Sequence, residues 1–279
     1  MKRTILGVAA LSMLFFAACK KDSLEPTETE IQDMSVATED LGNAESYLQT
    51  AEDESEETVF LRGNNPNPAG ACPTLTWIAT RGTYPNQLTV DYGTTGCVGR
   101  SGRTRKGKVI INWSAAPTAT GALRTVTFNN FYIDSVKLEG TRTWNNQGAN
   151  AQGLPSFTRT VSIGLAYPGG AISTWESIHT VTQTEGAATA AWADNVYSIL
   201  GTESGTNRNG KRYKALITNS LIHKVTCPWL VTGVRSFTTE NLLNPQVFTI
   251  DYGFSNNECD RQALLTLPSG VTRTVLLRK

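Results

Sequence analysis

Runs in which apolar and polar residues alternate recur along most of this chain, and they constrain its fold more than any other feature. Thr, Val, Ile and Tyr dominate these runs, which is typical of β-strands with one buried face. We expect strands within residues 87–91, 108–113, 124–128, 131–142, 156–163, 172–182, 196–206, 214–218, 247–252, 263–267 and 271–277. No strong amphipathic helix follows residue 58, and parallel strands would need such helices as crossovers. The sequence therefore predicts an all-β domain, built as an antiparallel sandwich or as an extended twisted sheet.

Glycine-containing turn signals separate several of these runs. Asn209-Gly210 is the clearest, because a type I′ turn needs positive φ at both central residues. It predicts a hairpin between residues 197–206 and 211–218. Two further hairpins are predicted by Pro168-Gly169-Gly170 and by Pro268-Ser269-Gly270.

Two segments, about residues 70–115 and 225–279, repeat a pattern. Each contains Cys-Pro, then an alternating strand that ends in Asp-Tyr-Gly, and then a second cysteine. Four cysteines allow three pairings, but the repeat favours one disulfide within each copy, Cys72–Cys97 and Cys227–Cys259. Metal binding is the weaker interpretation, because no Cys-x-x-Cys spacing occurs and the chain has only two histidines. We expect neither a metal site nor a cofactor.

The N-terminus carries an export signal. Lys2 and Arg3 precede an apolar run over residues 5–16, which is short for a transmembrane helix. The following residues, Phe16-Ala17-Ala18-Cys19, resemble the lipobox of bacterial lipoproteins. This resemblance implies that residues 1–18 are removed as a signal peptide and that lipid on Cys19 anchors the chain in a membrane. An ordinary secretory signal is the alternative.

The residues after Cys19 bear on the location of the anchor. Lys20-Lys21-Asp22 resembles the signals that direct lipoproteins of Bacteroidetes-type bacteria to the outer face of the outer membrane. The resemblance implies a lipoprotein of the outer membrane that is exposed at the cell surface. A periplasm-facing anchor is the alternative.

Charge is distributed unevenly between two parts of the chain. Residues 22–57 contain thirteen acidic residues and no Lys or Arg, whereas residues 58–279 contain 21 Lys and Arg against 11 Asp and Glu. The acidic stretch has few apolar residues, so we expect residues 19–68 to be a disordered tether between the lipid and a folded domain over residues 69–279. Transient helix around residues 43–51 is compatible with this expectation. An intramolecular cover over the basic domain is the functional alternative.

Basic residues gather in two places beside predicted turns. The first group is Arg100, Arg103, Arg105, Lys106 and Lys108, and the second is Arg208, Lys211, Arg212 and Lys214. Together with Asp91-Tyr92-Gly93 and Cys97, residues 102–108 resemble a pattern of Bacteroidetes lipoproteins, which implies location and fold but no activity. Both groups are candidate sites for acidic polysaccharide or the phosphates of lipopolysaccharide, with nucleic acid the less favoured partner. The simpler interpretation is charge at edges and loops that keeps a sheet soluble.

Catalytic groups receive weak support from the sequence. Asp91 and Asp251 occupy equivalent places in the repeat and invite comparison with the paired carboxylates of glycosidases. Capping of backbone N–H groups beside the following glycine is the stronger interpretation. His179 and His223 lie outside any known catalytic motif, and packed or surface positions explain them. Most of the six tryptophans are core candidates, with sugar stacking as the alternative role for some.

These observations favour a lipid-anchored binding or structural module of the cell surface, without catalytic chemistry of its own and with polyanionic glycans as candidate ligands. The alternative is an extracellular, glycan-active hydrolase whose site residues converge only in the fold. An enzyme needs an acidic or nucleophile–base cluster in a cleft, whereas a binding module needs a patch or groove without one.

Overall fold

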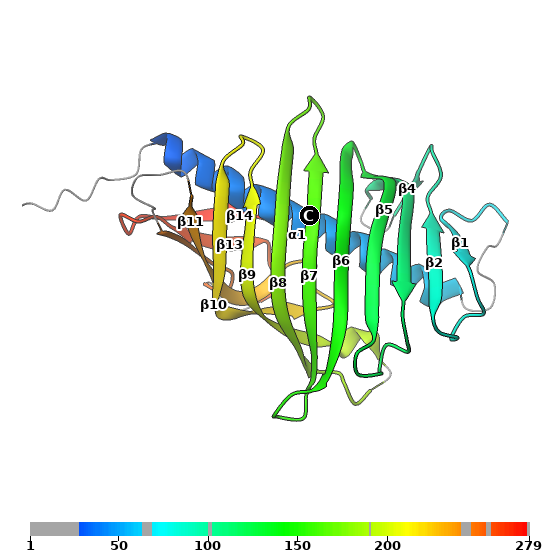
Figure 1. The fold of residues 1–279 in the computed structure, drawn as a ribbon. Helices are drawn as coiled ribbons and strands as arrows, with labels where there is room; N and C mark the ends of the chain where they lie inside the picture. The colour runs from blue at the N-terminus through cyan, green and yellow to red at the C-terminus, as the bar shows by residue number, and fades with distance from the viewer. Residues whose placement is uncertain are drawn as a thin grey trace, which may run out of the picture.

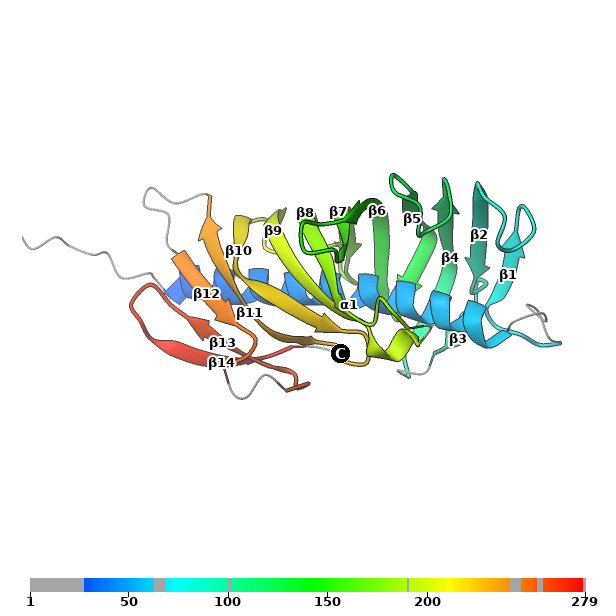
Figure 2. The same cartoon turned by 90° about the horizontal axis from the view of Figure 1, so that it is seen from below.

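The computed structural model describes residues 28–62, 69–99, 102–189, 191–240, 247–254 and 258–277. In these residues, one open β-sheet curves around a long helix, α1 (Glu28–Arg62), which runs across the strands inside the trough of the sheet (Figure 1 and Figure 2). The core lies between α1 and this concave face, where most of the buried apolar side chains gather.

The sheet has 14 strands, and neighbours in the chain are neighbours in the sheet except that β4 pairs with both β2 and β3. Every pairing is antiparallel. The strands are β1 (Thr74–Trp77), β2 (Asn86–Asp91), β3 (Cys97–Val98), β4 (Thr104–Trp113), β5 (Leu123–Ile133), β6 (Val136–Ala149), β7 (Pro155–Ala166), β8 (Ile172–Glu185), β9 (Val196–Thr206), β10 (Arg212–Lys224), β11 (Leu230–Thr239), β12 (Val247–Asp251), β13 (Gln262–Thr266) and β14 (Thr272–Leu276). The predicted antiparallel all-β fold is confirmed, and the form observed is the extended twisted sheet.

All three predicted hairpins form, with one difference in turn type. In the turn between β9 and β10, Gly210 has a φ of 78° but Asn209 is not in the left-handed region, so the turn is not type I′. Gly210 N donates to the carbonyl oxygen of Asn207 at 2.8 Å, which closes a four-residue turn. A turn at Asp134, with a φ of 53°, also divides the expected strand region 131–142 between β5 and β6.

Residues 28–62 form α1, which corrects the expectation of a disordered tether. Buried residues recur along α1 at alternating intervals of three and four, a spacing that places them on one helix face. They are Met34, Ala37, Leu41, Ala44, Leu48, Ala51 and Ser55. Four of these residues are Ala or Ser, so the stripe is narrow and only weakly apolar, and the concave sheet supplies the apolar surface that the helix lacks. The folded unit therefore includes residue 28 onward rather than beginning at residue 69.

Acidic side chains beside this stripe have arginine partners on the sheet. The pairs are Glu39 and Asp40 with Arg208 (2.8 and 2.7 Å), Glu45 with Arg235 (3.0 Å), and Glu52 with Arg142 and Arg124 (3.2 and 3.4 Å). The negative charge that argued for self-repulsion is thus compensated by the basic part of the chain. The acidic segment covers the basic sheet, as the functional alternative held.

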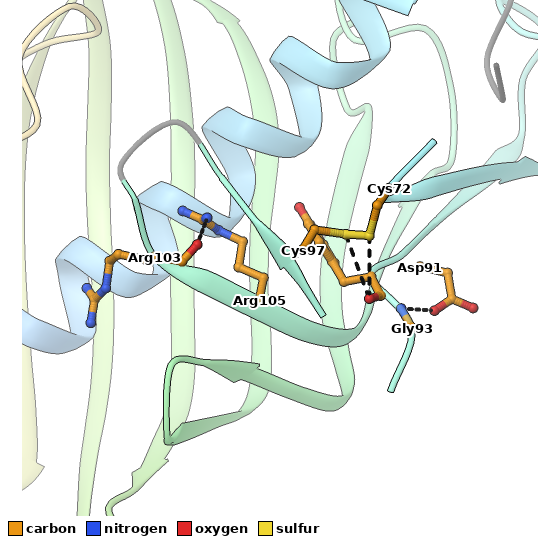
Figure 3. Close-up of a disulfide and its surroundings, with 7 residues drawn as sticks. Cys72, Asp91, Gly93, Cys97, Arg103 and Arg105 are labelled. Carbon is orange, nitrogen blue, oxygen red and sulfur yellow. Dashed lines mark hydrogen bonds between the residues drawn. A yellow bond between two sulfur atoms is a disulfide. The ribbon is translucent and has the colours of Figure 1, made fainter. Parts of the chain in front are cut away.

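Both disulfides that the repeat predicts are present. Cys72 is bonded to Cys97 and Cys227 to Cys259, with Cα–Cα distances of 5.8 and 5.7 Å (Figure 3 shows the first). The two repeat copies therefore each contain one disulfide, and they lie toward opposite ends of the sheet.

The aspartates of the repeat cap backbone groups, as the stronger interpretation predicted. Asp91 Oδ1 accepts a hydrogen bond from Gly93 N at 2.9 Å, and Asp251 Oδ1 accepts one from Gly253 N at 2.9 Å. Asp91 lies at the end of β2 and Asp251 at the end of β12, with eight strands between them in the sheet order. This arrangement gives no support to a catalytic pair.

Candidate ligand-binding site

An alternating row of tryptophans and arginines crosses the concave face of the sheet. Trp113 of β4, Arg124 of β5, Trp144 of β6 and Arg159 of β7 are aligned by the pairing of neighbouring strands. Residues paired in this way project from the same face of a sheet. Arg142 lies two residues before Trp144 and therefore shares this face. The row gathers cations and aromatic rings from four strands.

A cavity of about 270 Å³ lies between this row and α1. Gln49 and Glu52 of α1 close it on the helix side. Its wall also includes Phe157, Val181, Tyr197, Ile199 and His223. The exposed residues Pro117 and Leu123 lie at its rim, so solvent reaches the cavity beside the β4–β5 connection.

Three arginines and one carboxylate line this cavity, so its wall carries excess positive charge. Glu52 lies 3.2 Å from Nη1 of Arg142 and 3.4 Å from Nη1 of Arg124. The third arginine, Arg159, has no such contact with Glu52. Positive charge concentrated in a partly enclosed, low-dielectric site favours an anionic ligand.

Arg159 is buried without a counterion. Only 5% of the residue is exposed, and among the described residues no carboxylate lies within ion-pair distance of its guanidinium. Its Nε and Nη2 groups donate instead to His179 Nδ1, at 3.2 and 2.7 Å. Burial, followed by repulsion from Arg142, lowers the pKa of Arg159 to about 9, so the group is still charged at neutral pH. Burying a charge without a partner is costly, which makes Arg159 the group in this cavity with most to gain from an anion.

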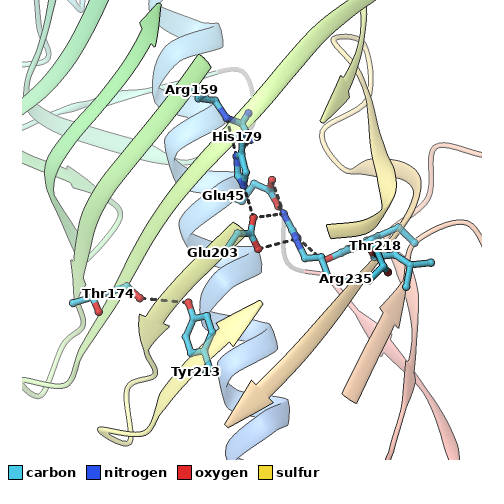
Figure 4. A network of polar contacts seen from close by, with 10 residues as sticks. Glu45, Arg159, Thr174, His179, Glu203, Tyr213, Thr218 and Arg235 are labelled. Carbon is cyan, nitrogen blue, oxygen red and sulfur yellow. Dashed lines mark hydrogen bonds and ion pairs between the residues drawn. The ribbon is translucent and has the colours of Figure 1, made fainter. Parts of the chain in front are cut away.

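A second buried arginine, Arg235 on β11, has two carboxylates as counterions (Figure 4). Its Nε lies 3.0 Å from Glu203 Oε2, and its Nη2 donates to Glu203 Oε1 at 3.1 Å. The same Nη2 lies 3.0 and 3.1 Å from the two carboxylate oxygens of Glu45 on α1. Its Nη1 donates to the Tyr252 hydroxyl at 2.5 Å. Arg235 therefore links the sheet to the helix through two carboxylates.

His179 stands between the two arginines. Because its Nδ1 accepts from Arg159, its proton lies on Nε2, which donates to Glu203 Oε1 at 2.9 Å. Burial lowers the pKa of His179, which keeps the ring neutral at pH 7. Burial alone would raise the pKa of Glu203, but the charge of Arg235 and the hydrogen bond from His179 outweigh it and lower that pKa. The network thus holds one carboxylate ionised and one imidazole neutral.

Several buried polar atoms of the cavity lining form no hydrogen bond among the described residues. They include Glu52 Oε1, Trp144 Nε1 and His223 Nε2. Burial lowers the pKa of His223 to about 4, so its ring is neutral at pH 7. Buried polar groups usually have partners, and a hydroxyl or carboxylate of a bound ligand would provide them.

The first predicted basic group does not form an exposed patch. Arg105 is fully buried, with its Nη1 donating to the carbonyl oxygen of Arg103 at 3.0 Å (Figure 3). Arg103 pairs with Asp134 at 2.9 Å, and its guanidinium lies 4.2 Å from the ring centre of Tyr47 on α1. These contacts turn both arginines toward the protein interior, which corrects their assignment to a surface site.

The remaining lysines of that group have local partners on the protein itself. Lys108 pairs with Asp91 at 2.9 Å. The Lys106 ammonium lies 4.3 Å from the ring centre of Tyr132. Arg100 falls outside the described residues. These contacts agree with the simpler interpretation, in which charge at edges and loops keeps the sheet soluble.

The residues of the second predicted basic group also do not form one exposed patch. Arg208 lies between Glu39 and Asp40 of α1, and Arg212 pairs with Glu240 at 3.1 Å. Lys211 is exposed in the turn. The structure therefore places Arg208 in the contact between helix and sheet rather than on an open surface.

The charged residues of the concave face were missed in the sequence, although a signal for them exists. Arg159 stands between Phe157 and Val161, and Arg235 precedes Phe237 by two, so both arginines fall on the apolar side of their alternating strands. An arginine in that position predicts a buried cation that needs a partner. Within the described ranges, no three His, Cys, Asp or Glu side chains gather as metal ligands.

Cys19 and the lipobox lie outside the described residues, so the predicted lipid anchor stays a prediction. Where the structure describes the chain, α1 is too polar to cross a membrane, and no other helix meets the length and hydropathy that a span requires.

No protein-family model matches this chain, and no curated protein or solved structure is similar to it with statistical significance.

Proposed function

We propose that this chain is a lipid-anchored binding module of the cell surface that captures acidic glycans in the cavity between α1 and the sheet. The anchor and its location rest on the resemblance of residues 16–22 to lipoprotein signals. The ligand class rests on the cavity, whose wall combines aromatic rings with an excess of arginines. Small-molecule sites have this character, mainly apolar with a few polar groups that converge on the ligand.

One observation carries the proposal: Arg159 is a buried cation that lines a cavity, and no carboxylate of the described residues lies within ion-pair distance of it. A protein that needed this arginine only for stability would gain from a carboxylate beside it, as Arg235 has. An anionic ligand supplies that carboxylate only when it binds.

Binding rather than hydrolysis is supported by the state of His179 and Glu203. Both ring nitrogens of His179 are engaged, one by Arg159 and one by Glu203. Glu203 in turn contacts Arg235 through both carboxylate oxygens. A general base must be able to take a proton from the substrate. Neither ring nitrogen of His179 is left to accept one, and Glu203 is paired with the charge of Arg235.

The test is a screen of the purified full chain in detergent against acidic and neutral glycans. We expect acidic glycans to bind without being cleaved, and Arg159→Met to abolish that binding while Arg212→Met, a change at an exposed arginine, preserves it. Cleavage of a glycan, or equal binding by both variants, would contradict the proposal.

The anchor is tested separately. Cys19→Ala should release the protein from the membrane fraction, because lipid on Cys19 is the proposed attachment. A variant that stays fully bound to membranes would overturn the lipoprotein assignment and leave the ligand proposal untouched.

A further inference from the structure

We infer that the cavity accepts a single sugar ring that carries a carboxylate, so that the protein reads the acidic end of a glycan rather than an internal stretch of polyanion. This inference rests on the proposed function and narrows its ligand class. It assigns the carboxylate to Arg159 and the ring to the space beside Trp113.

The size of the cavity limits the ligand to about one ring. Its volume of about 270 Å³ is just below the range of roughly 300–1,000 Å³ that is typical of sites for drug-sized ligands. α1 covers the cavity along one side through Gln49 and Glu52, and the exposed rim lies at the β4–β5 connection. A cavity of this volume has room for the end of a glycan but not for several consecutive sugars.

The N–H groups of Arg159 that do not contact His179 are suited to bind a carboxylate. Its Nε and Nη2 groups both donate to His179 Nδ1, so that edge of the guanidinium is occupied. The Nη1 group forms no hydrogen bond within the described part of the chain, so it can donate to a ligand. A hydrogen bond from a charged donor to a carboxylate is among the stronger ones in proteins. One cation without a counterion calls for one negative charge, which a carboxylate supplies.

Aromatic side chains provide a platform for the ring. Trp113 lines the cavity and is held from outside by Trp77, whose ring stacks on it at 5.6 Å with an interplanar angle of 17°. Aromatic faces of this kind pack against the apolar side of a flat ligand. Trp144 Nε1 and His223 Nε2 have no hydrogen-bond partner where the structure describes the chain, and hydroxyl groups of a sugar would satisfy both atoms.

The experiment compares matched ligands by isothermal titration of the full chain in detergent. The probes are glucuronate, its uncharged methyl ester, glucose, glucose 6-phosphate and a heparin chain. We expect glucuronate to bind with a stoichiometry of one and at least tenfold more tightly than the ester, glucose or the phosphate. Arg159→Met should weaken glucuronate binding at least thirtyfold, and Trp113→Leu about tenfold. Arg212→Met, which removes an exposed arginine outside the cavity, is the control and should leave the affinity unchanged.

The possible failures separate this inference from the proposed function. If heparin binds and glucuronate does not, or if Arg159→Met leaves glucuronate binding intact, the single-ring inference is wrong while a glycan-binding module stands. Tighter binding of glucose 6-phosphate than of glucuronate would overturn the choice of a carboxylate. If none of these ligands binds, both proposals fall. Circular dichroism of each variant at 25 °C shows whether a lost affinity reflects lost folding, and Trp113→Leu gives a second test where Arg159→Met does not fold.

Discussion

Two buried arginines on the same concave face have opposite surroundings. Arg235 lies between the carboxylates of Glu203 and Glu45, which outweigh the effect of burial and raise its pKa well above the usual value. Arg159 lies on the far side of His179 and contacts no carboxylate of the residues that the structure describes, and burial lowers its pKa to about 9. The neutral imidazole of His179 thus separates Arg235, which is paired with carboxylates, from Arg159, which is not.

The difference indicates that the two buried arginines have different roles, one structural and one in ligand binding. The Arg235 side of the trough holds α1 against the sheet, because Glu45 belongs to the helix and Glu203 to β9. The Arg159 side borders the cavity and keeps a charge whose desolvation the carboxylates of Glu45, Glu203 and Glu52 offset only in part. Pairing one buried cation and leaving the other unpaired divides the concave face into a structural half and a binding half.

The largest effect is expected from removing the compensated cation. Arg235→Met leaves Glu203 and Glu45 as carboxylates without their main counterion, and breaking a buried pair in this way typically costs about 3–5 kcal/mol. Urea unfolding at pH 7 measures the loss. Arg212→Met, at an exposed arginine, is the matched control, and a loss below about 1 kcal/mol for Arg235→Met would show that the pair does not hold the helix.

Acidification should weaken the fold through the histidine at the cavity. The pKa of His223 is lowered to about 4 by burial, with Arg159 and Arg142 acting in the same direction and Glu45 against them. The unfolded chain takes up this proton near pH 6.5, whereas the folded chain stays neutral until about pH 4. The free energy of unfolding should therefore fall as pH drops, by about 2 kcal/mol between pH 7 and pH 5 from this group alone.

His179 acts in the same direction, because burial lowers its pKa as well. His223→Gln keeps a polar side chain that does not titrate, so its stability should depend less on pH by about the same 2 kcal/mol over this window. Urea unfolding at the two pH values measures both proteins. An unchanged pH dependence in the variant would mean that His223 titrates normally in the folded chain.

A smaller effect is expected at the carboxylate that faces the cavity. Glu52→Gln preserves size but removes the one negative charge in the wall, so the affinity for glucuronate should rise about tenfold, or about 1.4 kcal/mol. Glu240→Gln, which changes an acid paired with Arg212 outside the cavity, is the control. Unchanged or weaker binding by the Glu52 variant would mean that Glu52 does not oppose the ligand.

The smallest effect is expected at the exposed basic residues. Replacing Lys211 and Arg212 with Glu should change stability by less than about 1 kcal/mol, since surface ion pairs contribute little. The affinity for glucuronate should not change. Reduced affinity for glucuronate would return the site to the basic group that the sequence first indicated.

The strands could be predicted because their signal is local. Alternation within five to ten residues identifies a half-buried strand whatever its neighbours are, and the repeat of Cys-Pro and Asp-Tyr-Gly added the disulfide pairing. The helix lacked such a signal. Its buried stripe depends on Met34, Leu41 and Leu48 with small residues between them, and its acidic residues need arginines far along the chain to make burial favourable.

The candidate site depended on register, which alternation does not give. Trp113, Arg124, Trp144 and Arg159 come from four strands, and only their pairing places them side by side. The two basic groups attracted attention because their lysines and arginines cluster in the sequence. The cations that line the cavity are isolated in the sequence and cluster only in the sheet.

The unfolding free energy of Arg159→Met, set beside that of Arg235→Met, tests most directly whether Arg159 is a cation without a counterion. The variant removes an uncompensated buried charge but leaves His179 Nδ1 without its donor, and these two effects oppose each other. We therefore predict that Arg159→Met unfolds within about 1 kcal/mol of the unchanged protein in urea at pH 7, far from the loss of about 3–5 kcal/mol for Arg235→Met. Equal losses for the two variants would contradict the division of the concave face into a structural half and a binding half.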